Sequence, residues 1–217
     1  MVVACAAPQQ AQQAQHAHGG DHHGNAWDRT YARGTGFRLE PNALLQQTAA
    51  SLPPGVALDV GMGQGRNALH LASLGWKVTG VDPSVEGNRI AREAAAAKGL
   101  TLDAVVGGIY DFDLGRERYD LVALIYVGGA DLAERIITAL KPGGVVVVEF
   151  FHRDMEASLG HHMGAFETHE LERLFPGFEV LRSETVEDVA DFGLQRSKLV
   201  RSASASARGT SSAQVTE

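Results

Sequence analysis

The chain has 217 residues, of which 44% are hydrophobic and 21% charged, so it is long enough for one α/β domain with a full core and short tails. A formal net charge of -7 and the absence of a long Lys/Arg run argue against nucleic acid or an anionic membrane surface as the main partner, and favour a small molecule. The single cysteine, Cys5, excludes an internal disulfide framework and a multi-cysteine metal site, and no apolar run is long enough to cross a bilayer.

Residues 1–25 consist mainly of Ala, Gln, Gly and His, without the apolar periodicity needed to bury a face, and we predict a disordered tail. Neutral imidazoles close together in a flexible segment are competent ligands for a transition metal. A solvated linker is the favoured interpretation, because nothing nearby supplies a fixed geometry. The histidines concerned are His16, His18, His22 and His23.

The opening Val2-Val3-Ala4-Cys5 resembles the end of a bacterial lipoprotein signal, although the charged and apolar parts of such a signal are missing. A truncated signal ending at Cys5, and hence an exported protein, and a chance match are equally weighted. The sequence as given otherwise predicts a cytoplasmic protein with one domain over residues 26–204 and a second disordered tail over 205–217.

Within the domain, residues 26–52 predict an N-terminal cap in which Trp27, Tyr31 and Phe37 precede a helix from Pro41 to about Ser51. From residue 56 onward, apolar runs alternate with helical patterns, which predicts a doubly wound, Rossmann-like parallel sheet. The predicted strands are 56–60, 76–82, 102–106, 119–125 and 145–151, and the predicted helices are 68–74, 84–98 and 132–140. After them we predict a short helix over 168–175 and strands over 178–182 and 198–204, with an extended polar segment between the two strands.

The strand-to-helix turn after residue 60 carries three glycines at alternate positions: Gly61, Gly63 and Gly65. Glycine permits positive φ and a close approach of the backbone to a ligand, so the turn predicts a nucleotide-sized cradle. A dinucleotide-binding G-x-G-x-x-G pattern would need glycine at Arg66. Asp59, two positions before the first glycine, suits a ligand with a cationic amine better than a pyrophosphate, which points away from NAD.

The run from Asp59 to Asn67, followed one unit later by Val81-Asp82-Pro83-Ser84, resembles the class I S-adenosylmethionine-dependent methyltransferases. Within that class, Gly65-Arg66-Asn67 is similar to small-molecule members related to the tellurite-resistance methyltransferase. The resemblance implies a seven-stranded sheet with the last strand antiparallel, S-adenosyl-L-methionine as cofactor and a small-molecule acceptor. It covers about residues 42–201, with its most specific motifs in the glycine loop and the second-strand acid.

Position by position, the resemblance implies that Asp59 contacts the methionine amine of the cofactor and that Asp82 accepts hydrogen bonds from the ribose hydroxyls. Asp111 and Phe112 stand where the family contacts the adenine ring, with Asp113 as an alternative acid. The expected cofactor-binding residues are Asp59, Gly61, Gly63, Gly65, Asn67, Asp82, Asp111 and Phe112. No resident metal is expected.

Methyl transfer is an in-line displacement for which the protein contributes mainly position, so a dedicated base is optional. Ligands of open α/β sheets bind beyond the carboxyl ends of the strands, which selects His152, Tyr126 and, from the cap, Tyr31 as catalytic candidates. His152 is the preferred base or acceptor-binding residue, equally weighted with a strand-end histidine hydrogen-bonded to backbone.

Two alternatives accompany the methyltransferase: a non-catalytic protein that only binds S-adenosylmethionine, and an exported lipid-anchored protein with a metal-binding His-rich arm. The acceptor atom and the choice between monomer and dimer stay open.

Overall fold

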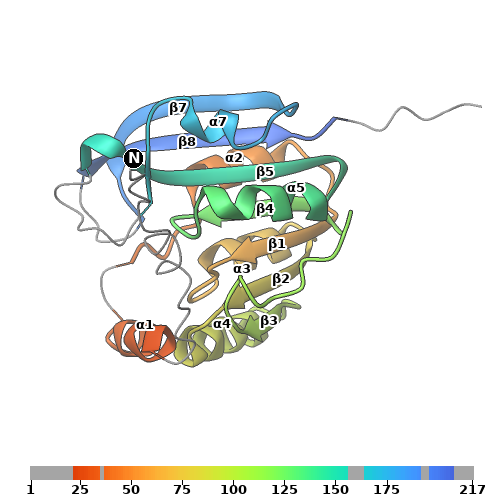
Figure 1. The fold of residues 1–217 in the computed structure, drawn as a ribbon. Helices are drawn as coiled ribbons and strands as arrows, with labels where there is room; N and C mark the ends of the chain where they lie inside the picture. The colour runs from red at the N-terminus through yellow and green to blue at the C-terminus, as the bar shows by residue number, and fades with distance from the viewer. Residues whose placement is uncertain (1–21, 35–36, 156–163, 192–195, 208–217) are drawn as a thin grey trace, which may run out of the picture.

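The structure, a computed structural model, describes residues 22–34, 37–155, 164–191 and 196–207. They build one mixed eight-stranded sheet with the strand order β3-β2-β1-β4-β5-β8-β7 (Figure 1), and the short β6 pairs with β5. The strands are β1 (Val56–Val60), β2 (Lys77–Asp82), β3 (Asp103–Val106), β4 (Tyr119–Ile125), β5 (Leu140–His152), β6 (Ala165–Phe166), β7 (Glu179–Val189) and β8 (Arg196–Ala205).

The strands β1 to β5 pair in parallel, whereas β8 runs antiparallel to both β5 and β7. The predicted doubly wound, mostly parallel sheet with its last strand antiparallel is therefore confirmed, and the two residues of β6 add an eighth strand to the seven that form the main path. The central strands read as continuous apolar runs because both of their faces are covered.

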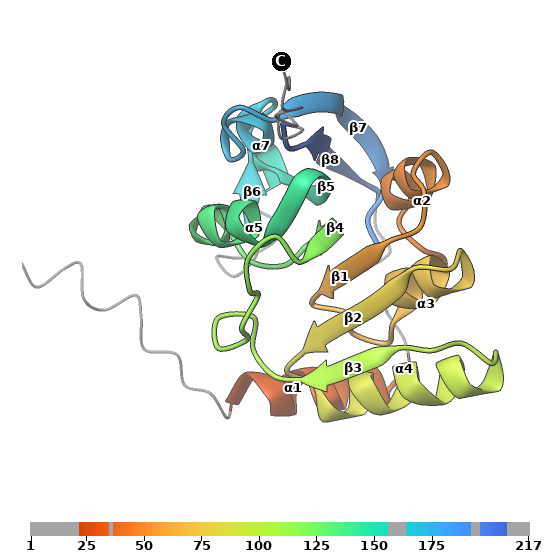
Figure 2. The same cartoon turned by 90° about the vertical axis from the view of Figure 1, so that its right-hand side faces the viewer.

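Helices cover both faces of this sheet (Figure 2). The helices α2, α3 and α4 supply buried residues to the hydrophobic cluster on one face, and α5 and α7 supply them to the cluster on the other. The helix α1 packs beside α4. The helices are α1 (His22–Ala32), α2 (Ala43–Ala50), α3 (Arg66–Ser73), α4 (Val85–Ala97), α5 (Ala133–Ala139) and α7 (Glu170–Arg173), with 3-10 turns η1 (Ala130–Leu132) and η2 (Arg153–Met155).

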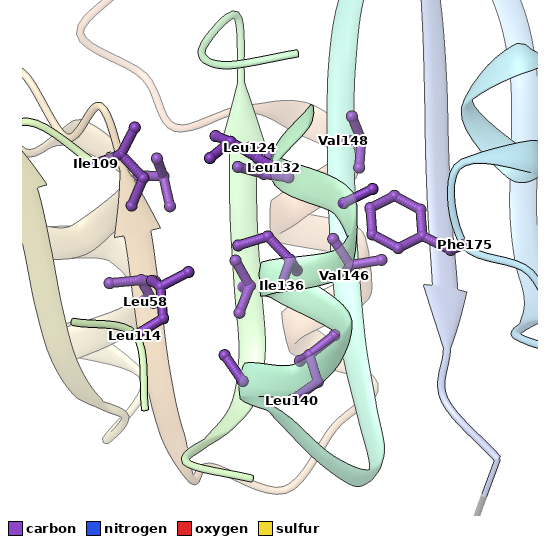
Figure 3. Close-up of a cluster of buried hydrophobic side chains, with 14 of the residues drawn as sticks. Leu58, Ile109, Leu114, Leu124, Leu132, Ile136, Leu140, Val146, Val148 and Phe175 are labelled. Carbon is purple, nitrogen blue, oxygen red and sulfur yellow. The ribbon is translucent and has the colours of Figure 1, made fainter. Parts of the chain in front are cut away.

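The apolar residues of α5 and the turn before it pack into a buried cluster against the sheet (Figure 3). Leu132 and Ile136 are fully buried, and the same cluster contains Leu124 and Val148 from the two neighbouring strands. Burying one such side chain contributes about 1.5–3 kcal/mol, so this stripe fixes α5 against β4 and β5. Because β4 and β5 are parallel, their carboxyl ends lie at the same edge of the sheet.

The C-terminal hairpin differs from the prediction. The segment expected to be an extended polar connection belongs largely to β7, which continues to Val189, and to β8, which begins at Arg196. β7 is an edge strand whose residues are exposed or half-buried, so its sequence lacks the apolar alternation that marks a strand. The predicted helix over 168–175 is also shorter, and only Glu170–Arg173 are helical.

The N-terminal helix α1 begins at His22, inside the segment predicted to be a disordered tail. Asp28 explains why a segment with little apolar periodicity is placed here, because its Oδ1 accepts hydrogen bonds from Ser84 Oγ at 2.5 Å and Glu86 N at 2.9 Å at the start of α4. Cys5, His16 and His18 lie outside the described residues, so the lipoprotein and metal-site hypotheses are not tested there. In the described part of the chain, no helix is long and apolar enough to span a membrane.

Candidate functional site

The glycine turn after β1 has the backbone conformation expected from its sequence. Gly61, Gly63 and Gly65 have φ of 67°, 57° and 82°, all in the left-handed region. This region costs other L-residues roughly 1–2 kcal/mol, which is the reason for glycine at each position. Gly61 N also donates to Val81 O at 2.8 Å, which ties the turn to β2.

An aromatic cluster from the N-terminal cap lies over this turn. A Cβ built on Gly63 would lie 2.5 Å from Tyr31 Oη, so the tyrosine hydroxyl lies directly against the Gly63 backbone. The Tyr31 ring lies 5.9 Å from that of Trp27 and 5.0 Å from that of Phe37, measured between centroids. The three rings that the sequence placed in one cap are therefore brought together against the glycine turn.

Asp82 ends β2 next to the turn. Its Oδ2 accepts from Gly63 N at 2.9 Å and its Oδ1 from Ser84 N at 2.8 Å, and the residue is 5% exposed. Burial raises the pKa of Asp82, and the two backbone donors act against that rise. Each carboxylate oxygen has two lone-pair positions, so both oxygens keep a position for another donor.

Asp59 and Asn67, two of the expected cofactor residues, lie behind the turn rather than on the cavity wall. Asp59 is 1% exposed and accepts from Ala68 N at 3.0 Å, and burial raises its pKa to about 7. Asn67 is 4% exposed, and its Oδ1 accepts from Asn42 N at 2.9 Å. Asp59 thereby holds the start of α3 in place and Asn67 ties it to the start of α2, because each accepts from a backbone donor that would otherwise be buried without a partner.

The turn borders a cavity of about 700 Å³ at the carboxyl ends of β1, β2 and β4. This is the size of a small-molecule or cofactor site, and the position is the usual one in open α/β sheets. The polar and aromatic groups on its wall that matter below are Trp27, Tyr31, Arg66, Asp82, Tyr126 and Asp191.

Asp191, just beyond β7, reaches this cavity from the far end of the sequence. Its Oδ2 lies 2.8 Å from Arg66 Nη2 and accepts from Asn42 Nδ2 at 2.9 Å, while Arg38 Nε is 4.0 Å from Oδ1. Asp191 was not predicted as a site residue. Its place depends on the β7–β8 hairpin, and we found no local motif in the sequence that marks it.

Tyr126, a predicted catalytic candidate, lines the cavity just after β4 with φ of 57°. Its hydroxyl donates to Glu149 Oε1 at 2.5 Å, and Glu149, which is fully buried, has its Oε2 2.5 Å from Arg201 Nε. Arg201 Nη2 lies 2.7 Å from Asp188 Oδ2. Burial and the Glu149 carboxylate raise the pKa of Tyr126 far above its ordinary value, so its proton stays on the phenol.

His152 and the pair Asp111 and Phe112 are not brought to the cavity wall. His152 is 4% exposed, its Nδ1 accepts from Asp154 N at 3.1 Å, and its Nε2 lies 3.5 Å from Glu167 Oε2. These contacts are those of the alternative considered for His152 in the sequence, a strand-end histidine hydrogen-bonded to backbone. The loop after β3 turns toward α5, where Arg135 Nη2 donates to Phe112 O at 2.8 Å, and Asp111 is exposed.

Residues 57–144 match the family model of a methyltransferase domain. A ubiquinone biosynthesis O-methyltransferase of Methylobacterium sp. (strain 4-46) is 33% identical over 105 residues, which cover 46% of this chain and 42% of that relative. The chain therefore aligns with less than half of the length of this relative.

Two solved structures are similar in fold to this chain. TehB from Haemophilus influenzae has a TM-score of 0.62 at 18% identity, over 76% of this chain and 62% of that one. The 1,6-didemethyltoxoflavin-N1-methyltransferase of Burkholderia thailandensis, solved with 1,6-didemethyltoxoflavin and S-adenosylhomocysteine bound, has a TM-score of 0.56 at 22% identity, over 76% and 79% of the two chains. The match of residues 57–144 to a methyltransferase domain agrees with the resemblance that the glycine turn and Asp82 predicted, and the two solved structures share the predicted fold.

Proposed function

We propose that this chain, whose residues 57–144 match a methyltransferase domain and whose fold is shared with TehB, is a class I S-adenosylmethionine-dependent methyltransferase that transfers a methyl group from S-adenosyl-L-methionine to a small-molecule nucleophile. Its similarity to a ubiquinone biosynthesis O-methyltransferase and to a 1,6-didemethyltoxoflavin-N1-methyltransferase supports a small acceptor and leaves the accepting atom open. Because this methyl donor is made in the cytosol, the proposal places the protein in the cytoplasm.

One observation carries the proposal. The glycine turn and Asp82 lie side by side, joined by the Gly63 N to Asp82 Oδ2 hydrogen bond, on the wall of a cavity with the volume of a cofactor site. The residues fit the cofactor, because any side chain at Gly63 would crowd the turn, and because Asp82 keeps acceptor positions that a ribose diol can fill. The backbone from Gly61 to Gly65 would line the methionine and sugar parts.

The bound cofactor would supply an electrophilic methyl group on a sulfonium. The chain's own contribution is to orient the two reactants and to keep water away, and holding reacting atoms in line is worth on the order of 7–11 kcal/mol. Trp27, Tyr31 and Phe37 form an apolar wall suited to that task. Tyr126 closes the wall beside the turn, and its hydroxyl proton is engaged by Glu149.

Several assigned roles stay predictions. Asp59 would act on the methionine amine through the turn that it supports, or through water. Contacts of Asp111, Phe112 or Asn67 with the cofactor would require a different arrangement from the one seen. A direct role of His152 in catalysis would likewise require its side chain to leave its present partners.

Calorimetric titration with S-adenosylmethionine tests the cofactor assignment. Asp82→Ala should weaken binding by about tenfold or more, because it removes charged hydrogen bonds worth about 1.5–3 kcal/mol each. The matched control is Glu187→Ala, which removes an exposed carboxylate on β7 that is not among the residues of the cavity wall. Equal affinities for wild type and Asp82→Ala would contradict the ribose assignment.

Transfer itself is tested with a panel of thiols, phenols, amines and oxyanions, read by release of S-adenosylhomocysteine. Release above the no-enzyme blank is the expected result. Tight cofactor binding with no release for any acceptor would favour the non-catalytic binding protein.

A further inference from the structure

Catalysis on a neutral acceptor needs a place for the acceptor's proton, and the cavity offers one carboxylate from outside the cofactor motifs. Asp191 is on the cavity wall, and its side chain is 7% exposed. It stands next to the glycine turn, because its Oδ2 is 2.8 Å from Arg66 Nη2 and Arg66 is the first residue of α3. The β7–β8 hairpin thus brings this acid to the cavity at the carboxyl ends of the parallel strands.

The two oxygens of Asp191 differ in what they bind. Oδ2 is engaged by Arg66 and by Asn42 Nδ2 at 2.9 Å. Oδ1 has the Arg38 Nε at 4.0 Å, which is beyond hydrogen-bond distance. Arg66 and Asn42 therefore fix the orientation of the carboxylate through one oxygen and leave lone pairs on the other for an acceptor.

Two of the three catalytic candidates predicted from the sequence, Tyr126 and His152, are engaged in other contacts. Tyr126 keeps its proton, because its hydroxyl donates a hydrogen bond to the Glu149 carboxylate, and a protonated phenol does not act as a base. His152 is not among the residues of the cavity wall, and its Nδ1 accepts from the Asp154 backbone. Within the described residues, Asp191 is the acidic wall residue left once Asp82 is assigned to the cofactor.

We propose that Asp191 is a catalytic residue that accepts the proton of the methyl acceptor, which is a protonated nucleophile on a flat apolar body held by the aromatic wall. This rests on the proposed function. In the step, the acceptor atom forms a bond to the methyl carbon while the carbon–sulfur bond breaks and its electron pair stays on sulfur. The acceptor's X–H bond breaks, its electron pair stays on X, and the proton passes to Oδ1 of Asp191.

Two aromatic acceptors of similar shape separate this role from a structural one. At about pH 8, phenol is protonated, whereas benzenethiol is largely ionised and needs no base. Asp191→Asn should lower kcat/KM for phenol by about 10²- to 10⁴-fold, the usual contribution of a general base, and should lower that for benzenethiol by about tenfold or less. Asp191→Glu should recover part of the phenol rate. Glu187→Gln, an exposed acid on β7, is the matched control and should leave both rates unchanged.

Binding to the cofactor-free protein gives a readout that does not depend on turnover. Titration should show that wild type prefers phenol over its methyl ether, because a carboxylate accepts the phenol hydrogen bond, and that Asp191→Asn reduces this preference. Equal losses of transfer to phenol and benzenethiol would overturn the proposal and leave Asp191 a structural residue. Wild type that binds S-adenosylmethionine but methylates neither probe would overturn the acceptor class, while the absence of cofactor binding would instead refute the proposed function.

Discussion

Asp59 allows a prediction about stability and pH that needs no substrate. Its side chain is fully buried behind the glycine turn, and burial raises its pKa to about 7 from an ordinary 3.8. A carboxyl whose pKa is higher in the folded state binds its proton more tightly there. Folding is therefore most favoured where Asp59 is protonated, and this contribution is lost as pH rises from the unfolded pKa to the folded pKa.

Each pH unit between these two values costs about 1.4 kcal/mol. The charged carboxylate thus destabilises the fold by about 4 kcal/mol at pH 8, of which about 3 kcal/mol develops between pH 5 and pH 8. Asp59→Asn keeps an oxygen that can accept from Ala68 N and has no charge to bury. The free energy of unfolding of the variant should therefore rise relative to wild type by about 3 kcal/mol across this interval.

Urea unfolding of both proteins at several pH values measures this difference, and the difference between the two curves cancels the titration of the other groups. Asp113→Asn, which changes an exposed acid, is the matched control. A gap between Asp59→Asn and wild type that is constant from pH 5 to pH 8 would refute the reasoning, since it would mean that Asp59 does not change its protonation in this interval.

Two further changes test the packing around the site by urea unfolding. Gly63→Ala should lower the free energy of unfolding by more than the roughly 1–2 kcal/mol that alanine costs in the left-handed region, because its Cβ would lie 2.5 Å from Tyr31 Oη. The loss should be smaller in a Tyr31→Phe background, and additive effects of the two changes would contradict the contact. Arg201→Met should lower the free energy of unfolding by about 3–5 kcal/mol, because it leaves the buried Glu149 carboxylate without its cation. The double variant Arg201→Met/Glu149→Gln should lose less, and a double variant as unstable as Arg201→Met alone would show that the charge is not the cause.

Much of the fold could be predicted because the buried parallel strands leave a local signature. The runs at β1, β4 and β5 are apolar on both faces, and the glycines of the first turn need φ values that few other residues adopt. The edge strand β7 carries no such signature, since one of its sides faces solvent, and its length was underestimated. The start of α1 was missed because its first residues, His22 to Asn25, include no apolar residue, and the Asp28 hydrogen bonds to the start of α4 leave no local pattern in the sequence.

The assignment of His152 shows how finely a site depends on strand geometry. Side chains alternate between the two faces of a strand, so His152 shares the face of Phe150, and Glu149 shares the opposite face with Phe151. Phe151 packs against Tyr126, and Glu149 accepts a hydrogen bond from the Tyr126 hydroxyl. Glu149 and Phe151 therefore contact the cavity-wall residue Tyr126, whereas His152 takes the opposite face, and the sequence offered no means of choosing the face.

The sequence by itself determined the glycine turn, the acid at the end of the second strand and the aromatic cap, because each depends on residues close together in the chain or on a backbone conformation that only one residue type adopts readily. The tertiary structure alone decided which polar side chains join them. Asp191 reaches Arg66 and Asn42 only because β8 runs antiparallel to both β5 and β7, which places the carboxyl end of β7 at the same edge of the sheet as the carboxyl ends of the parallel strands. Such contacts depend on strand order and on the face each residue takes, and neither is encoded in the residues next to Asp191.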